Sequence, residues 1–157
     1  MPAEEHHVSL REITSETVRS VCSLSVADSQ KSFVAPNAVS LAQALFSASA
    51  WYRAIHLSEQ LVGFVMLRDE SLLKPPISNP QANLWRFMID TRYQGKGIGK
   101  AALLQIIEHV RSRSHFSSLA TSYVPGVGCP EKFYLGLGFR HTGGLKNGEV
   151  LLDLPLS

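Results

Sequence analysis

The spacing of hydrophobic and polar residues changes along this chain, and each spacing predicts a type of element. Alternating apolar and polar residues, rich in branched and aromatic side chains, predict strands. These strands are expected at residues 8–13, 51–57, 61–67, 84–90, 119–123, 139–142 and 150–154. Apolar residues three and four positions apart predict helices from Thr14 or Ser15 to about residue 26, from Ser40 to about residue 48, over residues 101–113 and just before Gly138. The resulting order, βααβββαβαββ, predicts an α/β fold.

Composition predicts one globular domain over residues 1–157. The chain has 157 residues, of which 45% are hydrophobic and 18% charged, and it contains neither an internal repeat nor a long linker. A net charge of +2, without a dense block of Lys and Arg, does not favour a nucleic-acid partner. The N-terminal residues lack the basic and apolar regions of a secretory signal, and no apolar run reaches membrane-spanning length. We therefore expect a cytoplasmic protein with no membrane partner.

The two cysteines predict neither a metal site nor a disulfide framework. Cys22 and Cys129 lie far apart in the sequence, and no Cys-x-x-Cys pair is present. Both are expected to be reduced, buried thiols. No metal is predicted.

The stretch that carries most chemical information is residues 94–100, Gln-Gly-Lys-Gly-Ile-Gly-Lys, between a predicted strand and a predicted helix. Its glycines allow sharp turns and a close approach of the backbone to a ligand. The unpaired amides and the dipole at a helix N-terminus favour a phosphate or pyrophosphate. A mononucleotide P-loop is excluded because Ala101 stands where a hydroxyl residue is needed for magnesium. The dinucleotide fingerprint also fails: from Gly95 its sixth position would be Lys100, and from Gly97 it would be Ala102, which only the relaxed form allows. The second match also lacks an early position in the chain and a clear acidic ligand for the ribose.

The remaining pattern, Gln-x-x-Gly-x-Gly, resembles motif A of the GNAT N-acetyltransferase superfamily. The resemblance implies the GNAT fold, with a mixed, mostly antiparallel sheet of six to seven strands and about four helices. It also implies acetyl-CoA as co-substrate, bound where the central strand diverges from its neighbour after a bulge. The implied contacts are the backbone of Phe87, Met88 and Ile89 for pantetheine and Gln94, Gly95, Lys96, Gly97, Ile98, Gly99 and Lys100 for pyrophosphate. The alternatives are a turn that only joins strand to helix, and solvated lysines at Lys96 and Lys100.

A second segment, residues 129–139, is similar to the family's late helix, which commonly ends in Phe-Tyr-x-x-Leu-Gly-Phe. Tyr134 matches the tyrosine that family members often place beside the thioester sulfur. The resemblance implies that Tyr134 is the general acid that protonates the leaving thiolate. The family's usual Asn, about seven residues earlier, is replaced by Val127, which removes one expected contact with pantetheine.

The acceptor is indicated by a further resemblance, to bacterial spermine/spermidine acetyltransferases of the diamine type. It is based on residues 33–37, 84–90 and 148–150, and implies a small-molecule amine, in particular a polyamine. Phe33 and Asn37 are then expected over the amine, with Glu149 as a substrate-binding carboxylate. The other candidate carboxylates for a polycation are Asp28, Glu59 and Asp90.

The general base stays open. Some polyamine acetyltransferases have a glutamate on the motif strand, where this chain has Trp85 and Arg86. Water could instead pass the proton toward Glu149, Asp90, His56 or His141, each of which is more typical of a solvated surface residue. Trp85 could line an apolar amine site, although a core position is more typical.

Two further alternatives stay open. The chain could be a non-catalytic acyl-CoA-binding module, or it could acetylate another amine, such as an aminoglycoside, an amino acid or a peptide. The apolar stretch 150–156 is a candidate surface for a homodimer.

Overall fold

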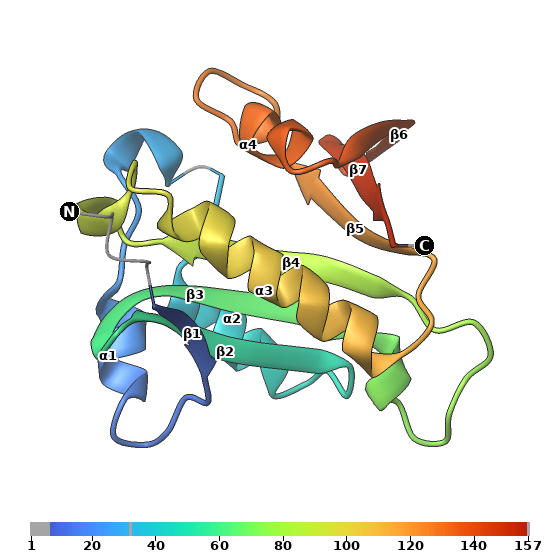
Figure 1. The fold of residues 1–157 in the computed structure, drawn as a ribbon, viewed down its shortest axis with the longest axis horizontal. Coiled ribbons are helices and arrows are strands. Elements are labelled where there is room, and N and C mark those ends of the chain that lie inside the picture. The colour runs from blue at the N-terminus through green and yellow to red at the C-terminus, as the bar shows by residue number, and fades with distance from the viewer. Residues whose placement is uncertain (1–6, 32, 157) are drawn as a thin grey trace.

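The protein is described by a computed structural model that covers residues 7–31 and 33–156. Within these residues, seven strands form one sheet with the order β1-β2-β3-β4-β5-β7-β6 (Figure 1). The strands are β1 (Val8–Arg11), β2 (Ala50–Leu57), β3 (Gln60–Asp69), β4 (Ala82–Ile89), β5 (Ser118–Tyr123), β6 (Arg140–Lys146) and β7 (Glu149–Pro155). The α-helices are α1 (Val18–Ser23), α2 (Asn37–Ala44), α3 (Ile98–Arg113) and α4 (Glu131–Gly136). The predicted order βααβββαβαββ and the mostly antiparallel sheet are confirmed.

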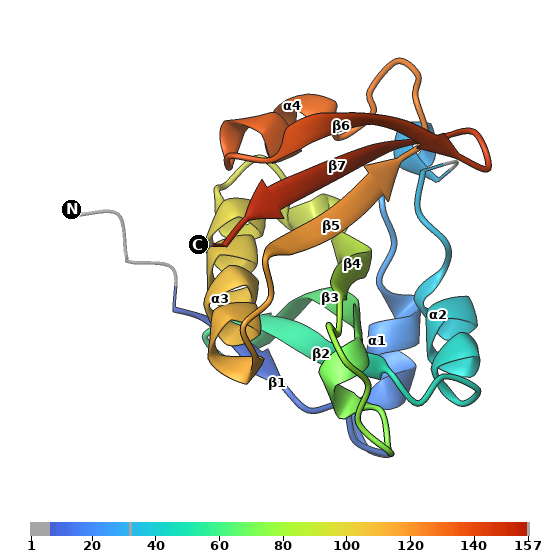
Figure 2. The same ribbon diagram turned by 90° about the vertical axis from the view of Figure 1, so that its right-hand side faces the viewer.

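The two faces of the sheet carry different helices (Figure 2). On one face, Leu103 and Ile106 of α3 pack with Val65 and Leu67 of β3 in a fully buried cluster. On the other face, Val21 of α1 belongs to a second cluster that also contains Phe64, Met66 and Met88. From Gly63 onward, odd and even positions of β3 therefore supply the two cores, as expected for a strand covered on both sides.

The central strand β4 contains a bulge and then leaves its neighbour. Against β3, Leu84 pairs with Leu67 and Arg86 with Met66, so Trp85 is the extra, unpaired residue. Against β5, only Ala82 and Asn83 are paired, in the parallel direction. The Thr121 hydroxyl of β5 donates to the Leu84 carbonyl oxygen at 3.2 Å, and the strands diverge beyond this point (Figure 2). The expected divergence after a bulge is confirmed.

The N-terminal helices differ from the prediction at their boundaries. α1 starts at Val18 after Thr17, because the expected cap, Thr14, instead accepts a hydrogen bond from the Glu16 amide in the preceding turn. α2 starts at Asn37, three residues before Ser40, because Pro36 at its N-cap position has φ −56° and its carbonyl accepts the first helical hydrogen bonds.

The cysteines are free thiols, but the prediction of burial is wrong for Cys22. α1 presents only Val21 to the sheet, and Cys22 lies on its exposed side. Cys129 is partly buried in the segment before α4.

No helix in the described part of the chain is both long enough and apolar enough to cross a bilayer.

Candidate active site

The turn between β4 and α3 has the backbone of an anion-binding site. Gly95 and Gly97 adopt left-handed φ angles of +75° and +80°, which L side chains rarely adopt. A Cβ on either residue would meet no atom within 4 Å, so open space surrounds both. The Ala101 amide donates to the Gly97 carbonyl oxygen, which leaves the amides of Ile98, Gly99 and Lys100 without helical partners. These donors and the dipole of a 16-residue helix suit a pyrophosphate.

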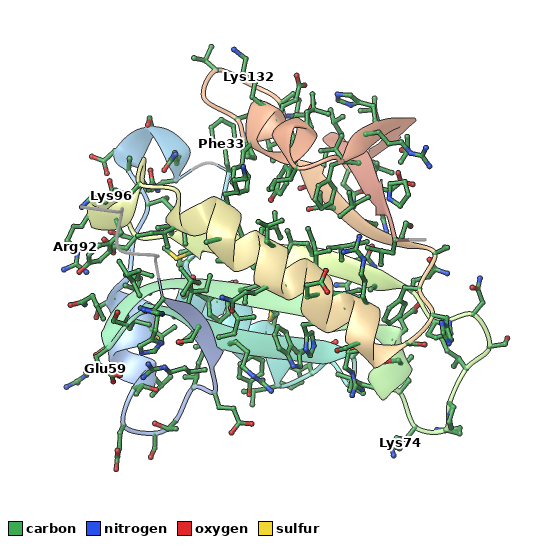
Figure 3. The ribbon with its side chains drawn as sticks, in the orientation of Figure 1. Phe33, Glu59, Lys74, Arg92, Lys96 and Lys132 are labelled. Atoms are coloured by element: carbon green, nitrogen blue, oxygen red, sulfur yellow. The ribbon has the colours of Figure 1, made fainter. Side chains whose placement is uncertain are left out.

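The non-glycine side chains of this turn differ in whether they face the cavity, the protein interior or the solvent. The Gln94 side chain donates to the Ile89 carbonyl oxygen at 2.8 Å and to Gln30 at 2.9 Å, so it fixes the turn against β4 and the segment after α1. The Ile98 side chain is buried in the α3 core, which leaves only its amide for a ligand. Lys96 is exposed (Figure 3) and lies outside the cavity lining. Lys100 lines the cavity.

A cavity of about 1080 Å³ includes the space between the diverging strands β4 and β5. The expected cofactor residues that line it are Phe87, Met88, Ile89, Gln94, Gly95, Gly97, Gly99 and Lys100. We call the part formed by residues 94–100 the glycine-turn end. Phe33, from the segment between α1 and α2, also lines the cavity and packs near Gly126 before α4 (Figure 3). The cavity therefore spans both faces of the sheet.

Tyr134 lies in this cavity on α4. Its side chain packs against Phe133 and Phe139, at ring-centroid distances of 5.5 and 5.3 Å, and the residue is only 7% exposed. Burial raises the pKa of Tyr134 to about 12, while a hydrogen bond with Thr121 acts in the opposite direction. The phenol therefore keeps its proton at neutral pH. The left-handed Gly138 follows α4, and its amide donates to Leu135 in the arrangement expected of a C-terminal glycine.

Of the three expected substrate-binding residues, Phe33 and Glu149 line the cavity and Asn37 does not. The Asn37 side chain is buried and donates to the Val21 carbonyl oxygen at 2.9 Å. It acquires this position because α2 starts at Asn37, where the side chain faces α1. In the structure, Asn37 joins α1 to α2.

The other candidate carboxylates lie elsewhere. Asp28 is exposed and forms an ion pair with Lys31. Glu59 is also exposed (Figure 3) and forms an ion pair with Arg11. Asp90 is buried after β4, where burial opposes its ionisation, yet hydrogen bonds from Arg92 and Ser25 outweigh this effect and lower its pKa. Asp90 is therefore not the solvated residue expected from the sequence.

The histidines do not reach the cavity either. His56 is buried on β2, where burial lowers its pKa, so the expectation of a surface residue is wrong for it. His141 is exposed on β6, with Nε2 3.8 Å from Glu131. Among the four base candidates, only Glu149 lines the cavity.

The bulge in β4 brings to the cavity two arginines that the sequence analysis did not assign to the site, together with Trp85, for which a core position was expected. Arg68, Trp85 and Arg86 line the cavity, and the Arg68 guanidinium lies 4.2 Å from the centroid of the Trp85 ring. We call Arg68, Trp85, Arg86 and Glu149 the arginine end. Trp85 is only partly buried, because the bulge turns it toward the α1–α2 face, contrary to the core position that is more typical. The signal in the sequence was a pair of arginines within otherwise apolar strands.

Comparison with known proteins agrees with this geometry. The model of the acetyltransferase (GNAT) family matches residues 19–138. The chain belongs to this family. It is an acetyl-CoA-dependent N-acetyltransferase, as the motif around Gly97 predicts.

One relative in sequence and two solved structures match nearly the whole length of this chain. The chain is 28% identical to the spermine/spermidine N(1)-acetyltransferase of Bacillus subtilis over 152 residues, which cover 92% of this chain and 96% of the relative. The PaiA N-acetyltransferase from Thermoplasma acidophilum, solved with coenzyme A, superposes with a TM-score of 0.64 at 16% identity and covers 94% of this chain and 98% of its own. A GNAT acetyltransferase from Elizabethkingia anophelis with bound acetyl-CoA gives a TM-score of 0.64 at 16% identity, covering 95% and 98%. The two structures are similar to this chain in fold.

The residues of this acetyltransferase fit coenzyme A. The open space beside Gly95 and Gly97 admits a phosphate, and no strand of the described residues pairs with the edge of β4 beyond Asn83 on its β5 side. That edge offers backbone groups to a pantetheine arm in the way an added strand would. Within residues 7–31 and 33–156, no group of three His, Cys, Asp or Glu residues is placed to hold a metal ion.

Proposed function

We propose that this chain transfers the acetyl group of acetyl-CoA to the primary amine of a small molecule, by direct attack of the amine on the thioester carbonyl. The observation that carries the proposal is the gap between β4 and β5, which joins the glycine-turn end to the α1–α2 face. Such a gap lets a thioester and an amine approach from opposite faces of the sheet and meet in line.

The backbone at the glycine-turn end binds the pyrophosphate, with Lys100 as an added positive charge. Gln94 holds the turn in place through Ile89. The unpaired edge at residues 87–89 orients the pantetheine arm, and amides of this edge can polarise the thioester carbonyl oxygen. Lys96 has no direct role in this arrangement, because it lies outside the cavity lining.

Tyr134 is the proposed general acid. Its raised pKa keeps the phenol protonated, and its place in the cavity suits a proton transfer to the leaving sulfur. The amine loses its proton through water, with Glu149 as the cavity carboxylate that can receive it. Trp85 and Arg86 occupy the stretch of β4 where some polyamine acetyltransferases have a glutamate, so a base directly on β4 is not proposed.

A polyamine is the acceptor that the Bacillus subtilis relative supports, at 28% identity over nearly the whole chain. At neutral pH, a polyamine needs carboxylates for its remote ammonium groups. Glu149 supplies one carboxylate, with Phe33 covering the amine. Asp28, Glu59 and Asp90 supply none in the cavity, because their side chains lie outside its lining.

The deciding test is thiol release from acetyl-CoA in the presence of a panel of amines: spermidine, putrescine, amino acids, an aminoglycoside and a peptide. The proposal predicts thiol release that depends on the amine and saturates for one class of acceptor. A folded chain that binds acetyl-CoA but releases no thiol with any amine would instead be a non-catalytic acyl-CoA-binding module.

The cytoplasm is the proposed compartment, and a homodimer through residues 150–156 is the proposed assembly. β7 contributes Leu152 and Leu154 to the core, so only its partly buried residues, such as Val150, are available to a partner. Sedimentation equilibrium with wild type and Val150→Asp tests the dimer.

A further inference from the structure

Two arginines flank one indole ring in the acceptor part of the cavity. The guanidinium carbons of Arg68 and Arg86 lie 4.2 and 5.9 Å from the centroid of the Trp85 ring. Arg68 comes from β3, and the other two residues come from the bulge of β4. All three line the cavity.

Their position on the sheet is set by the strand pattern. Arg68 continues the series of Phe64 and Met66, and Arg86 precedes Met88 by two residues. Phe64, Met66 and Met88 belong to the core cluster under α1 and α2. Arg68 and Arg86 therefore lie on the face opposite α3, away from the glycine-turn end.

Neither guanidinium is neutralised by a carboxylate of the described chain within 4 Å, in contrast to Arg11, Arg92, Arg113 and Arg140. Arg86 instead donates to the Trp85 carbonyl oxygen at 3.0 Å and to Gln43 at 3.4 Å, both neutral groups. Burial lowers the pKa of Arg86, the charge of Glu149 raises it, and the charge of Arg68 lowers it again. Two partly buried cations close to each other are unfavourable unless an anion offsets them.

The other charges of the cavity do not offset them. Glu149 accepts a hydrogen bond from Ser122 at 3.3 Å and provides one carboxylate for the two guanidiniums. Asp153 is paired with Arg140 at 3.1 Å, and Lys146 adds a further positive charge to the lining. The arginine end therefore combines a net positive charge with a single carboxylate. Such a site disfavours a polycation and suits a ligand that carries both charges.

We propose that the acceptor is an amine that also bears a carboxylate, that is, an amino acid with a free amino group. Arg68 and Arg86 hold the carboxylate, and Glu149 attracts the amine. Planar guanidiniums match a carboxylate with paired hydrogen bonds, and stacking on Trp85 keeps Arg68 in place. The inference rests on the proposed acetyl transfer and replaces the polyamine as its acceptor.

The test compares acceptors that differ only in the carboxylate: lysine against cadaverine, and ornithine against putrescine. The full chain is assayed for thiol release at fixed acetyl-CoA. We expect kcat/KM to be about 10-fold or more higher for the amino acid of each pair, the size of a charge-assisted contact. A phosphorylated amine, phosphoethanolamine against ethanolamine, distinguishes a carboxylate site from a phosphate site.

Variants locate the effect. Arg68→Gln and Arg86→Gln should raise KM for lysine about 10-fold or more, so that most of the advantage of lysine over cadaverine is lost. Arg86→Lys keeps the charge without the planar fork and should give an intermediate KM. Arg53→Gln is the matched control, because Arg53 lies 4.6 Å over Trp51 in a similar stack outside the cavity. Melting temperatures identify a variant that has lost its fold, and in that case Arg86→Lys carries the test.

The outcomes separate this inference from the proposed function. A higher kcat/KM for cadaverine, putrescine or spermidine than for the amino acids would overturn the inference and leave acetyl transfer standing. A higher kcat/KM for phosphoethanolamine than for the amino acids would show that the arginines recognise a phosphate, and would overturn the proposal of a carboxylate. No thiol release with any amine, from a folded chain that binds acetyl-CoA, would overturn both.

Discussion

At the glycine-turn end of the cavity the binding groups belong to the backbone, whereas at the arginine end they belong to side chains. Gly95, Gly97 and the free amides of α3 form a cradle within one continuous segment. The arginine end takes Arg68 from β3, Arg86 from the bulge of β4 and Glu149 from β7. Backbone amides are present whatever the side chains are, while a side-chain site changes its ligand when a few residues change. We therefore expect the co-substrate and the acceptor to be recognised by groups that can vary independently.

The largest expected effect is at the glycine-turn end. Gly97→Asp puts a side chain and a negative charge at the proposed pyrophosphate site, so calorimetry should show loss of coenzyme A affinity by about 100-fold or more. The control is Gly143→Asp, because Gly143 has a φ of +87° and equally open surroundings outside the cavity. Both variants put a side chain on a residue with left-handed φ, which costs about 1–2 kcal/mol in each case. Equal coenzyme A affinity in the two variants would contradict pyrophosphate binding by the backbone of the glycine-turn end.

The next largest effect is a fall in kcat on substitution of Tyr134, which belongs neither to the glycine-turn end nor to the arginine end. Tyr134→Phe keeps the ring packing and removes the phenolic proton, so kcat should fall by about 10²–10⁴-fold while acetyl-CoA affinity is unchanged. Tyr123→Phe is the matched control, because Tyr123 also lines the cavity and its hydrogen bond to Glu131 raises its pKa to about 12. Near-normal turnover by Tyr134→Phe would mean that another group supplies the proton.

The pH profile follows from the burial of Tyr134. A general acid works below its pKa, and burial raises that pKa to about 12. Activity should therefore rise as the amine is deprotonated and then level off, with no decline between about pH 8 and pH 10. The measurement is kcat/KM against pH for wild type and Tyr134→Phe. A descending limb near the ordinary tyrosine pKa, present in wild type and absent in Tyr134→Phe, would contradict the effect of burial.

The smallest effect is expected from the carboxylate of the arginine end. Glu149→Gln should raise KM for the acceptor about fivefold, because a partly exposed charge contact contributes only about 1 kcal/mol, and added salt should reduce the difference. Acetyl-CoA affinity should stay constant. The control is Glu59→Gln, on the turn between β2 and β3 outside the cavity lining. A loss of coenzyme A affinity in Glu149→Gln would mean that Glu149 contacts coenzyme A, and would contradict its assignment to the acceptor.

Features that depend on one continuous segment could be predicted from the sequence, whereas features that depend on distant partners could not. The order of helices and strands along the chain and the turn at Gly97 depend on local periodicity and on glycine, which single segments display. Asn37 was expected at the acceptor because the start of α2 was placed three residues too late, a boundary that Pro36 sets. Asp90 and His56 were expected at the surface, because burial of polar groups depends on partners far away in sequence, as Ser25 is from Asp90. Arg68 and Arg86 were not found, because only the bulge and the pairing of β3 with β4 bring them together.

The most direct test of the account is the reaction itself, followed by mass spectrometry of the amine products. Wild-type protein, acetyl-CoA and the preferred amine should yield one acetylated amine for each thiol released, and Gly97→Asp should yield neither above the uncatalysed rate. Thiol release without an acetylated amine, or equal product from wild type and Gly97→Asp, would contradict acetyl transfer in this cavity.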